Sequence, residues 1–229
     1  MNIAIIGFGR LGASLERQIV KEGHSVTLKV SKPLKEEDVA ALEKTDLIYV
    51  LVPPTALLTT ALFLAKIKKP VVIGTTQWPL DQKASIFKAF KDGGSPMLYG
   101  ANFSLSVILL KKSMELFLQA AEKVGEEFSI RGLERHHEGK VDAPSGTANA
   151  WHQDLKAYSQ DPMPAFSYQR EGDEKGFHQI YMENEGNVLA WSHRAKERSI
   201  FAQGALLAGL WLIDKQGVFT FEHYVETLL

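Results

Sequence analysis

The first hundred residues alternate between short apolar runs and longer segments of mixed polarity. Five apolar runs have the length and composition of buried strands: residues 2–6, 25–30, 47–52, 71–74 and 97–99. Four intervening segments are interpreted as helices: residues 11–22, 35–44, 55–66 and 81–91. Because strands and helices alternate, we expect right-handed βαβ units and a doubly wound, mostly parallel sheet.

The pattern changes in the second half of the chain. Apolar side chains between Val107 and Ala121 recur at helical spacing, which predicts a long amphipathic helix. Another helix is expected to open near Ser145. Three strands are expected at residues 128–134, 177–182 and 188–194, the last two around an Asn-Glu-Gly-Asn hairpin signal. This half therefore predicts an α+β domain built on a mostly antiparallel sheet.

A glycine-rich turn follows the first predicted strand. Residues 3–12 read Ile-Ala-Ile-Ile-Gly-Phe-Gly-Arg-Leu-Gly, a strand that enters three glycines and then a helix. Glycines allow backbone N–H groups to approach a pyrophosphate closely, and the helix N-terminus adds a positive dipole end. The turn predicts dinucleotide binding, and a merely tight strand-helix connection is the alternative. The candidate contacts are Gly7, Phe8, Gly9, Arg10, Leu11 and Gly12.

The end of the second predicted strand bears on the choice of nicotinamide cofactor. An acidic side chain there would bind a free ribose 2′-hydroxyl. Residues 29–32 instead read Lys-Val-Ser-Lys, which offers a hydroxyl and ammonium groups suited to a 2′-phosphate. We therefore predict that NADPH is preferred over NADH, with Ser31 and Lys32 as contacts. Solvated lysines are the alternative interpretation.

Two further strand ends carry candidate cofactor contacts. A glycine lets the chain turn after the fourth strand, where two threonine hydroxyls can face a nicotinamide, and an asparagine after the fifth strand can hydrogen-bond a carboxamide. An ordinary strand terminus and an interdomain linker are the alternatives. The candidates are Gly74, Thr75, Thr76, Ala101, Asn102, Phe103 and Ser104.

Residues 136–148 concentrate reactive polar side chains in the order His-His-Glu-Gly-Lys-Val-Asp-Ala-Pro-Ser-Gly-Thr-Ala. An imidazole such as that of His136 can donate a proton near neutral pH. Lys140 can hold a carboxylate, and Ser145, Gly146 and Thr147 stand where a helix N-terminus exposes N–H groups to anions. The segment therefore predicts a pocket for a carboxylate-bearing substrate.

The same segment has two other interpretations. Metal binding by His136 and His137 is disfavoured, because adjacent residues diverge in a strand and no neighbouring histidine or acidic group completes a ligand set. We therefore predict no metal site. A structural loop with satisfied histidines is the second alternative, although the density of polar groups argues against it.

Composition limits the partners of the chain. With 26 basic and 27 acidic residues among 229, the net charge of −1 offers no electrostatic footprint for nucleic acid or an anionic membrane. No apolar segment approaches the roughly 20 residues of a membrane helix. The absence of cysteine excludes disulfides and a thiolate nucleophile, and a cytoplasmic location is expected.

The motifs together resemble one known family. His136-His137-x-x-Lys140-x-Asp142-Ala143-Pro144-Ser145-Gly146-Thr147-Ala148 resembles the signature of dihydrodipicolinate (4-hydroxy-tetrahydrodipicolinate) reductases. The similarity extends to Gly74-Thr75-Thr76, to Asn102-Phe103-Ser104 and to Arg170-x-Gly172-x-x-x-Gly176-x-His178. That family uses NADPH or NADH to reduce a heterocyclic dicarboxylate on the route to diaminopimelate and lysine.

The resemblance implies specific roles and an assembly. It implies that His136 is the general acid/base and that Lys140 is a second proton donor or a carboxylate partner. It implies a substrate clamp made of His137, Ser145, Gly146 and Thr147. It also implies a homotetramer joined through the second domain, whose hairpin at residues 177–194 supplies a suitable sheet.

These observations predict two domains. We expect a Rossmann-type dinucleotide-binding domain at residues 1–103, rejoined by residues 199–229, and a substrate-binding and oligomerisation domain at residues 104–198. The turn at Gly7 is one residue shorter than the family's usual G-x-x-G-x-x-G. Two rival functions remain open here, a nicotinamide-sensing protein that lost catalysis and another small-acid dehydrogenase, such as an aspartate dehydrogenase.

Overall fold

The computed structural model describes residues 1–76 and 78–229, and Leu80 by its backbone alone. The chain divides into two compact units. Unit 1 comprises residues 1–103 and 198–229, and unit 2 comprises residues 104–197. None of the helices in the described ranges is long and apolar enough to cross a membrane.

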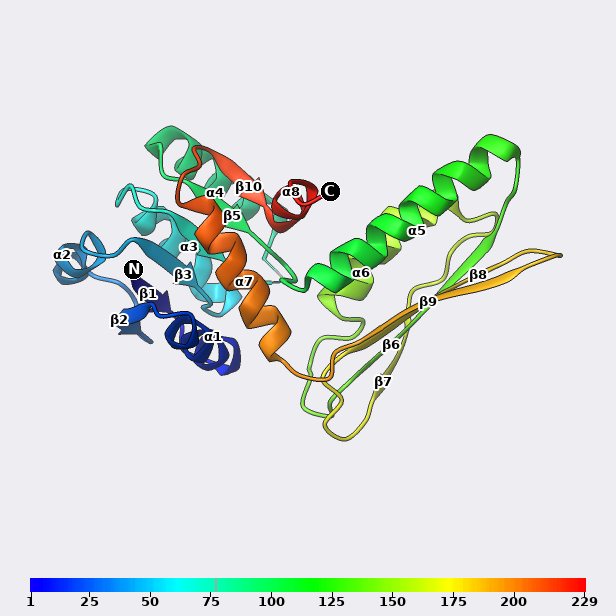
Figure 1. Cartoon of the computed structure of the whole chain (residues 1–229), viewed down its shortest axis with the longest axis horizontal. Helices are drawn as coiled ribbons and strands as arrows, with labels where there is room; N and C mark the ends of the chain where they lie inside the picture. Colours follow the sequence, from blue (N-terminus) through cyan, green and yellow to red (C-terminus); the bar gives the residue numbers. More distant parts are fainter. Residues whose placement is uncertain (77) are drawn as a thin grey trace. The chain divides into compact units, whose positions relative to one another are not determined.

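Unit 1 is built on a six-stranded sheet in which every neighbouring pair is parallel. The spatial order is β10-β5-β4-β3-β1-β2 (Figure 1). The strands are β1 (Asn2–Ile6), β2 (Ser25–Val30), β3 (Leu47–Val50), β4 (Val71–Ile73), β5 (Met97–Tyr99) and β10 (Val218–Thr220). The predicted doubly wound parallel sheet is confirmed. Strand β10 was not predicted, because three half-buried residues give too short a pattern.

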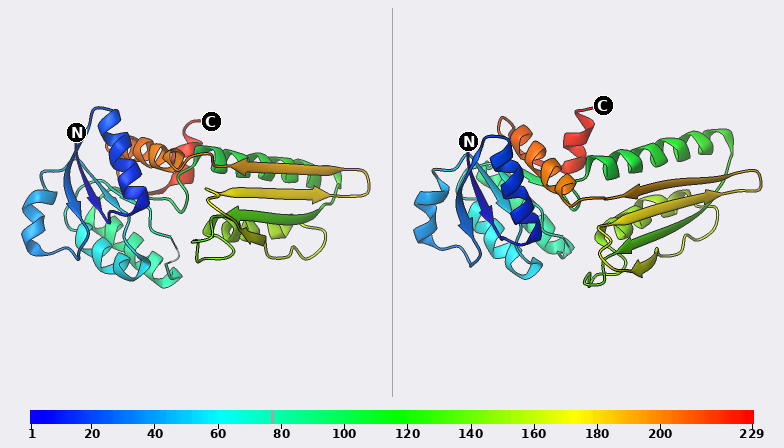
Figure 2. Two further views of the ribbon diagram at one scale, coloured as in Figure 1. Left: turned by 90° about the horizontal axis from the view of Figure 1, so that it is seen from below. Right: turned by 60° about the horizontal axis from the view of Figure 1, so that its bottom comes forward.

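Helices cover both faces of this sheet, with α1 and α7 on one face and α3 and α4 on the other (Figure 2). The helical elements are α1 (Arg10–Lys21), η1 (Glu36–Asp38), α2 (Val39–Leu42), α3 (Pro54–Leu64), α4 (Leu80–Gly93), α7 (Ser199–Leu212) and α8 (Phe221–Glu226). Helix α7 lies close to the sheet at Gly209, where a Cβ atom would be 2.1 Å from the Tyr49 hydroxyl. The C-terminal segment thus completes unit 1.

The order of the strands defines where a ligand can enter unit 1. Strand β1 lies between β2 and β3, so the chain leaves β1 toward one side and crosses to the other for β3. Such a reversal opens a crevice beyond the carboxyl ends of the strands. Strand β3 ends at Val50, two residues before the predicted end, and Pro54 occupies the first position of α3.

Unit 2 combines one sheet with two helices. The sheet has the order β7-β6-β8-β9, in which β6 and β7 are parallel and the other pairs are antiparallel. Its elements are α5 (Leu105–Val124), β6 (Ser129–His136), α6 (Gly146–Leu155), η2 (Lys156–Tyr158), β7 (Ser167–Arg170), β8 (Phe177–Glu183) and β9 (Val188–Arg194). The expected mostly antiparallel α+β architecture is confirmed. Strand β7 was missed because its residues are mostly exposed and show no apolar alternation.

One face of the unit 2 sheet changes character along the strands. Ile130 and Ile180 are fully buried and belong to a core that includes Trp151 from α6 and Met114 from α5. Farther along the same face, Glu134 of β6 contributes a carboxylate. The apolar core therefore ends in a polar cluster at the end of β6.

Candidate active site

The polar cluster of unit 2 is assembled by strand register. Glu134 and His136 are two residues apart on β6, so their side chains project from the same face. Glu134 lies opposite His178 of β8, and His136 lies opposite Arg170 of β7. Three strands thus bring together four titratable side chains that are separated by up to 44 positions in the sequence.

Glu134 is the buried centre of this cluster, with none of its side chain exposed. Its Oε1 atom accepts hydrogen bonds from Arg170 Nη2 at 2.9 Å and from the Ser145 backbone N–H at 3.2 Å. Its Oε2 atom pairs with Nδ1 of His136. Burial raises the pKa of Glu134, but the contacts of His136 and Arg170 outweigh it and lower the pKa to about 2. Glu134 is therefore an ionised carboxylate at neutral pH.

The two ring nitrogens of His136 have different surroundings. Its side chain is 12% exposed, and Nδ1 is engaged by Glu134. Gly176 stands beside the ring, and a Cβ atom at Gly176 would lie 3.3 Å from Nε2. A side chain at position 176 would therefore crowd Nε2, and the φ of 147° at this position also favours glycine.

His178 behaves differently from His136. It is 4% exposed, its Nε2 lies 3.1 Å from the Ser145 hydroxyl, and its ring packs edge-on against His136 with centroids 5.1 Å apart. Burial, reinforced by the nearby charge of His136, lowers the pKa of His178 to about 3. His178 is therefore neutral at physiological pH and serves as a packed hydrogen-bonding group.

The loop after His136 is organised around Arg170. The guanidinium donates from Nε to the Lys140 carbonyl oxygen at 3.2 Å and from Nη2 to the Asp142 carbonyl oxygen at 2.6 Å. The ammonium of Lys140 pairs with Asp142 Oδ1 at 2.5 Å. Since an ammonium has three donors, Lys140 can hold Asp142 and still contact a substrate carboxylate.

The predicted substrate clamp divides into two kinds of residue. Ser145 is buried and caps α6, its hydroxyl accepting from the Ala148 N–H at 3.2 Å. With its N–H bound to Glu134, Ser145 is committed to internal contacts. Gly146 and Thr147 form the first turn of α6, where backbone N–H groups face outward along the helix axis. His137 is half-buried, and its carbonyl oxygen accepts from the Lys140 N–H.

The prediction that no acidic or histidine group completes a ligand set with His136 was wrong. Potential ligand atoms of Glu134, His136 and His178 lie within 4.8 Å of one another. The set was missed because strand pairing brings His178 of β8, which is distant in sequence, opposite Glu134. Arg170 already compensates the charge of Glu134, so the cluster is balanced by the protein's own groups.

The glycine-rich turn of unit 1 fits a dinucleotide pyrophosphate. Gly7 has a φ of 91°, and a Cβ atom there would lie 2.5 Å from the Leu51 carbonyl group. A Cβ atom at Gly12 would lie 2.9 Å from the Gly7 carbonyl oxygen. Helix α1 begins at Arg10 after Gly9, which has no side chain to cap it, so the first N–H groups point into the turn. The backbone thus offers an anion-binding cradle.

A cavity of about 310 Å³ connects this turn with the end of β4. It is lined by Gly9, Arg10, Leu11, Gly12, Leu51, Val52, Pro54, Gly74, Thr75 and Thr76. The structure therefore unites two of the predicted cofactor segments. The segment that follows β3 adds Leu51, Val52 and Pro54, which were not predicted as contacts.

Several of the residues predicted to contact the cofactor instead make contacts within the protein. The Thr75 hydroxyl donates to the Val52 carbonyl oxygen at 2.8 Å, and the Ser104 hydroxyl caps α5. Phe103 is buried and packs edge-on against Phe221 at a centroid distance of 5.3 Å.

The remaining predicted cofactor residues lie nearer to the surface. Ala101 is exposed and Asn102 half-buried, and Phe8 is half-buried beneath the Lys29 ammonium, 4.9 Å from its ring centre. Ser31 and Lys32 are exposed just beyond β2, next to the turn because the Gly7 N–H donates to the Val30 carbonyl oxygen.

Comparison with known proteins identifies the family. The chain matches the family description "Dihydrodipicolinate reductase, N-terminus" over residues 1–103 and "Dihydrodipicolinate reductase, C-terminus" over residues 109–225. It is 32% identical to the 4-hydroxy-tetrahydrodipicolinate reductase of Christiangramia forsetii, covering 100% of this chain and 99% of that protein. The chain belongs to the dihydrodipicolinate reductase family. Accordingly it is an oxidoreductase of a family that uses NAD(P)H.

Two further comparisons agree with membership of the reductase family. The 4-hydroxy-tetrahydrodipicolinate reductase of Pseudomonas fluorescens is 37% identical over 69% of this chain and 65% of that protein. A dipicolinate-bound dihydrodipicolinate reductase from Paenisporosarcina sp. TG-14 superposes with a TM-score of 0.76 over 97% of this chain and 98% of that chain, at 18% identity. The latter likeness establishes a shared fold.

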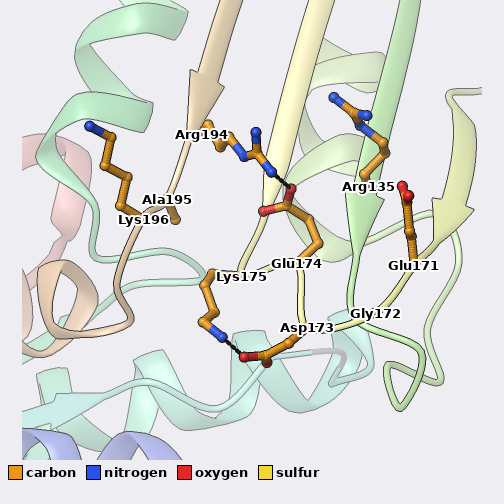
Figure 3. A pocket seen from close by; sticks show the side chains of 9 residues that line it. All are labelled: Arg135, Glu171, Gly172, Asp173, Glu174, Lys175, Arg194, Ala195 and Lys196. Carbon is orange, nitrogen blue, oxygen red and sulfur yellow. Dashed lines mark hydrogen bonds and ion pairs between the residues drawn. The ribbon is translucent and has the colours of Figure 1, made fainter.

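Unit 2 of this reductase also contains a cavity that was not predicted from the sequence. It measures about 570 Å³, and Figure 3 shows the side chains that line it. Arg135 and Arg194, at the ends of β6 and β9, place it on the sheet face opposite Glu134. Figure 3 shows Arg194 bound to Glu174 and Lys175 bound to Asp173. These internal ion pairs compensate much of the charge that lines it, whereas the proton-transfer candidates lie on the other face.

Proposed function

We propose that the loop of residues 136–147 performs the proton and carboxylate chemistry by which the chain reduces 4-hydroxy-tetrahydrodipicolinate to tetrahydrodipicolinate. The main support is the position of His136: the ionised carboxylate of Glu134 holds Nδ1, while Nε2 lies next to Gly176, which has no side chain to crowd it. An imidazole held in this way can act as a general acid/base at Nε2. His136 is therefore the proposed proton donor to the substrate ring or to its departing hydroxyl.

The dicarboxylate is proposed to bind between Lys140 and the start of α6. The ammonium of Lys140 supplies charge at one side of the loop, and the N–H groups of Gly146 and Thr147 supply donors at the other. His137 borders the same loop. Ser145, with both its N–H and its hydroxyl engaged internally, supports the clamp by fixing where α6 begins. Two fixed carboxylates would orient the ring and so lower the entropic cost of reaction.

Unit 1 is proposed to hold the reduced nicotinamide cofactor, which supplies a hydride when bound. Gly7, Gly9 and Gly12 let the backbone approach the pyrophosphate, and the first turn of α1 adds its N–H groups. Gly74 and Thr76 border the same cavity from the end of β4. Residues 101–104 follow β5, and their proposed contribution is to close the nicotinamide side of the site.

NADPH is the proposed preferred cofactor. The exposed Ser31 and Lys32 follow β2 at the place where a 2′-phosphate would lie, and no acidic side chain follows that strand directly. Lys29, in contrast, pairs with Glu16 at 2.9 Å, so its charge is already compensated. The preference therefore depends chiefly on Lys32.

A homotetramer is the proposed assembly. The face of the unit 2 sheet opposite Glu134 bears half-buried Tyr181 of β8, and Val188 on the neighbouring strand is 66% exposed. Such a surface suits sheet-to-sheet association of identical chains. Light scattering after size exclusion should give four times the mass of 25.5 kDa. A monomeric mass at micromolar concentration would contradict this assembly.

The activity is tested by a coupled assay. Aspartate semialdehyde, pyruvate and a purified upstream synthase generate the substrate in situ, while the loss of NADPH or NADH absorbance is followed. Oxidation that requires every component is expected, and the ratio of the two rates tests the NADPH preference. A folded protein that binds NADPH but oxidises it in no complete mixture would favour a sensor. Activity on amino or hydroxy acids instead would favour another dehydrogenase.

A further inference from the structure

Glu134 connects three parts of the candidate site through one buried carboxylate. Oε2 meets the imidazole of His136, whereas Oε1 accepts from both Arg170 and the Ser145 N–H. The motif of residues 136–148 does not include Glu134, and no contact with substrate or cofactor is proposed for it above. An unpaired carboxylate at a site without solvent exposure would be strongly destabilising, so its contacts are a requirement of its location.

The charge of Glu134 determines which nitrogen of His136 exchanges protons. An ionised carboxylate can only accept hydrogen bonds, so Nδ1 must carry a hydrogen. The pKa of Glu134, lowered to about 2, keeps the carboxylate in that state throughout the working pH range. In the neutral ring, Nε2 is then the basic nitrogen, and in the charged ring Nε2–H is the acid. Nε2 is also the atom beside Gly176.

Arg170 connects Glu134 to the rest of the loop of residues 136–147. The same guanidinium that pairs with Glu134 donates to the carbonyl oxygens of Lys140 and Asp142. Glu134 in turn holds the Ser145 N–H, directly before α6. Both ends of the loop and its middle are therefore tied to one buried ion pair.

We propose that Glu134 is a positioning residue: it holds the Nδ1 hydrogen of His136 and, with Arg170, fixes the loop that carries Lys140 and the start of α6. The proposal rests on the proposed role of His136 as acid/base. Glu134 itself exchanges no proton with the substrate. Its effect on turnover is transmitted through His136, and its effect on substrate affinity through the loop.

The first test reads the tautomer of His136 directly. Long-range ¹H–¹⁵N spectra of histidine-labelled protein at a pH where the ring is neutral distinguish Nδ1–H from Nε2–H, and the His136→Gln spectrum assigns the signal. The unmodified protein is expected to show Nδ1–H. A neutral ring with its hydrogen on Nε2 would overturn the proposal. This measurement needs no substitution of Glu134 and holds even if such variants fail to fold.

The second test separates turnover from cofactor binding. Glu134→Gln keeps the shape of the side chain but removes its charge, and it is expected to lower kcat about 10- to 100-fold. The KM for NADPH should stay within about twofold, because the cofactor turn belongs to unit 1. Glu183→Gln is the matched control, since Glu183 of β8 also pairs with an arginine, Arg131 at 2.5 Å, at the far end of the sheet. A loss of kcat equal in both variants would overturn the proposal.

A double variant distinguishes failure of this inference from failure of the proposed function. If Glu134 acts on turnover through His136, adding Glu134→Gln to His136→Gln should cost little further kcat. A further loss as large as that of the single variant would show that Glu134 acts elsewhere and would overturn the inference. Full turnover in His136→Gln alone would instead refute the acid/base role. The tautomer would still show whether Glu134 orients the ring.

Discussion

The two candidate sites of this reductase are built from different chemical groups. The turn of unit 1 consists mainly of backbone: glycines that admit close approach and N–H groups at the start of α1. The cluster of unit 2 consists of charged side chains buried together, with Glu134 and Arg170 at its centre. A backbone site is sensitive to added atoms, whereas a charge cluster is sensitive to protonation and to the loss of one partner. The two sites should therefore fail under different perturbations.

Removing the proposed proton donor should produce the largest effect. His136→Gln is expected to lower kcat by about 100-fold or more, the range for loss of a general acid. NADPH affinity should be unchanged, because the cofactor contacts lie in unit 1. Stopped-flow turnover and a fluorescence titration with NADPH measure the two quantities. Wild-type kcat in this variant would refute the assignment.

Two glycine substitutions should separate structure from binding in unit 1. Gly7→Ala is expected to destabilise the protein by roughly 2–4 kcal/mol, because a positive φ and a contact with the Leu51 backbone both oppose a Cβ atom. A Cβ atom at Gly9 meets nothing within 4 Å. Gly9→Ala should therefore unfold like the wild type in urea and yet bind NADPH about 10-fold more weakly. Equal losses of stability in both variants would contradict this distinction.

Acid should weaken unit 2 before unit 1. The pKa of His178 is lowered from 6.5 to about 3 and that of Glu134 from 4.5 to about 2, so the unfolded chain binds more protons than the folded chain as the pH falls. The contribution of these two groups to the free energy of unfolding is fully present above about pH 6.5. It declines toward pH 2, by up to about 1.4 kcal/mol per pH unit for each group while that group titrates.

Hydrogen exchange between pH 7.5 and 4.5 measures this decline in unit 2 peptides. His178→Gln should flatten the pH dependence above pH 4.5, where His178 is the titrating member of the pair. Equal protection of unit 2 at both pH values in the wild type would contradict the buried neutral state of His178.

Removing the ammonium group of Lys140 should moderately weaken substrate binding alone. Lys140→Ala removes one charge from the proposed carboxylate site and is expected to raise the substrate KM about 10-fold. Any accompanying loss of kcat would measure its second proposed role, as a proton donor. Steady-state kinetics with substrate generated in situ provides both parameters. An unchanged substrate KM would remove Lys140 from the clamp.

The smallest effect is expected at the edge of the cofactor site. Lys32→Ala should raise the KM for NADPH about 5-fold and leave the KM for NADH unchanged, because only the former carries the 2′-phosphate. Lys29→Ala is the control, since that ammonium already pairs with Glu16. Equal changes with both cofactors would show that Lys32 contributes no specificity.

Much of the site was visible in the sequence because its signals are local. The glycine turn occupies six consecutive residues between a strand and a helix, and the loop of residues 136–147 is continuous. Ser145 was expected among the substrate contacts, but the structure shows that its polar groups serve the α6 cap and Glu134. A hydroxyl at a helix start looks the same in sequence whether it caps the helix or contacts a ligand.

The sequence by itself determined the alternation of strands and helices, the glycine turn and the motif around His136, since each depends on periodicity or on neighbouring residues. Only the tertiary structure decided that Glu134, Arg170 and His178 surround that histidine. Strand pairing brings them together across 44 positions, and the register of β6 with β7 and β8 is a property of the folded sheet. Burial then decides protonation, because exclusion of water and the charges enclosed with a group determine whether it ionises.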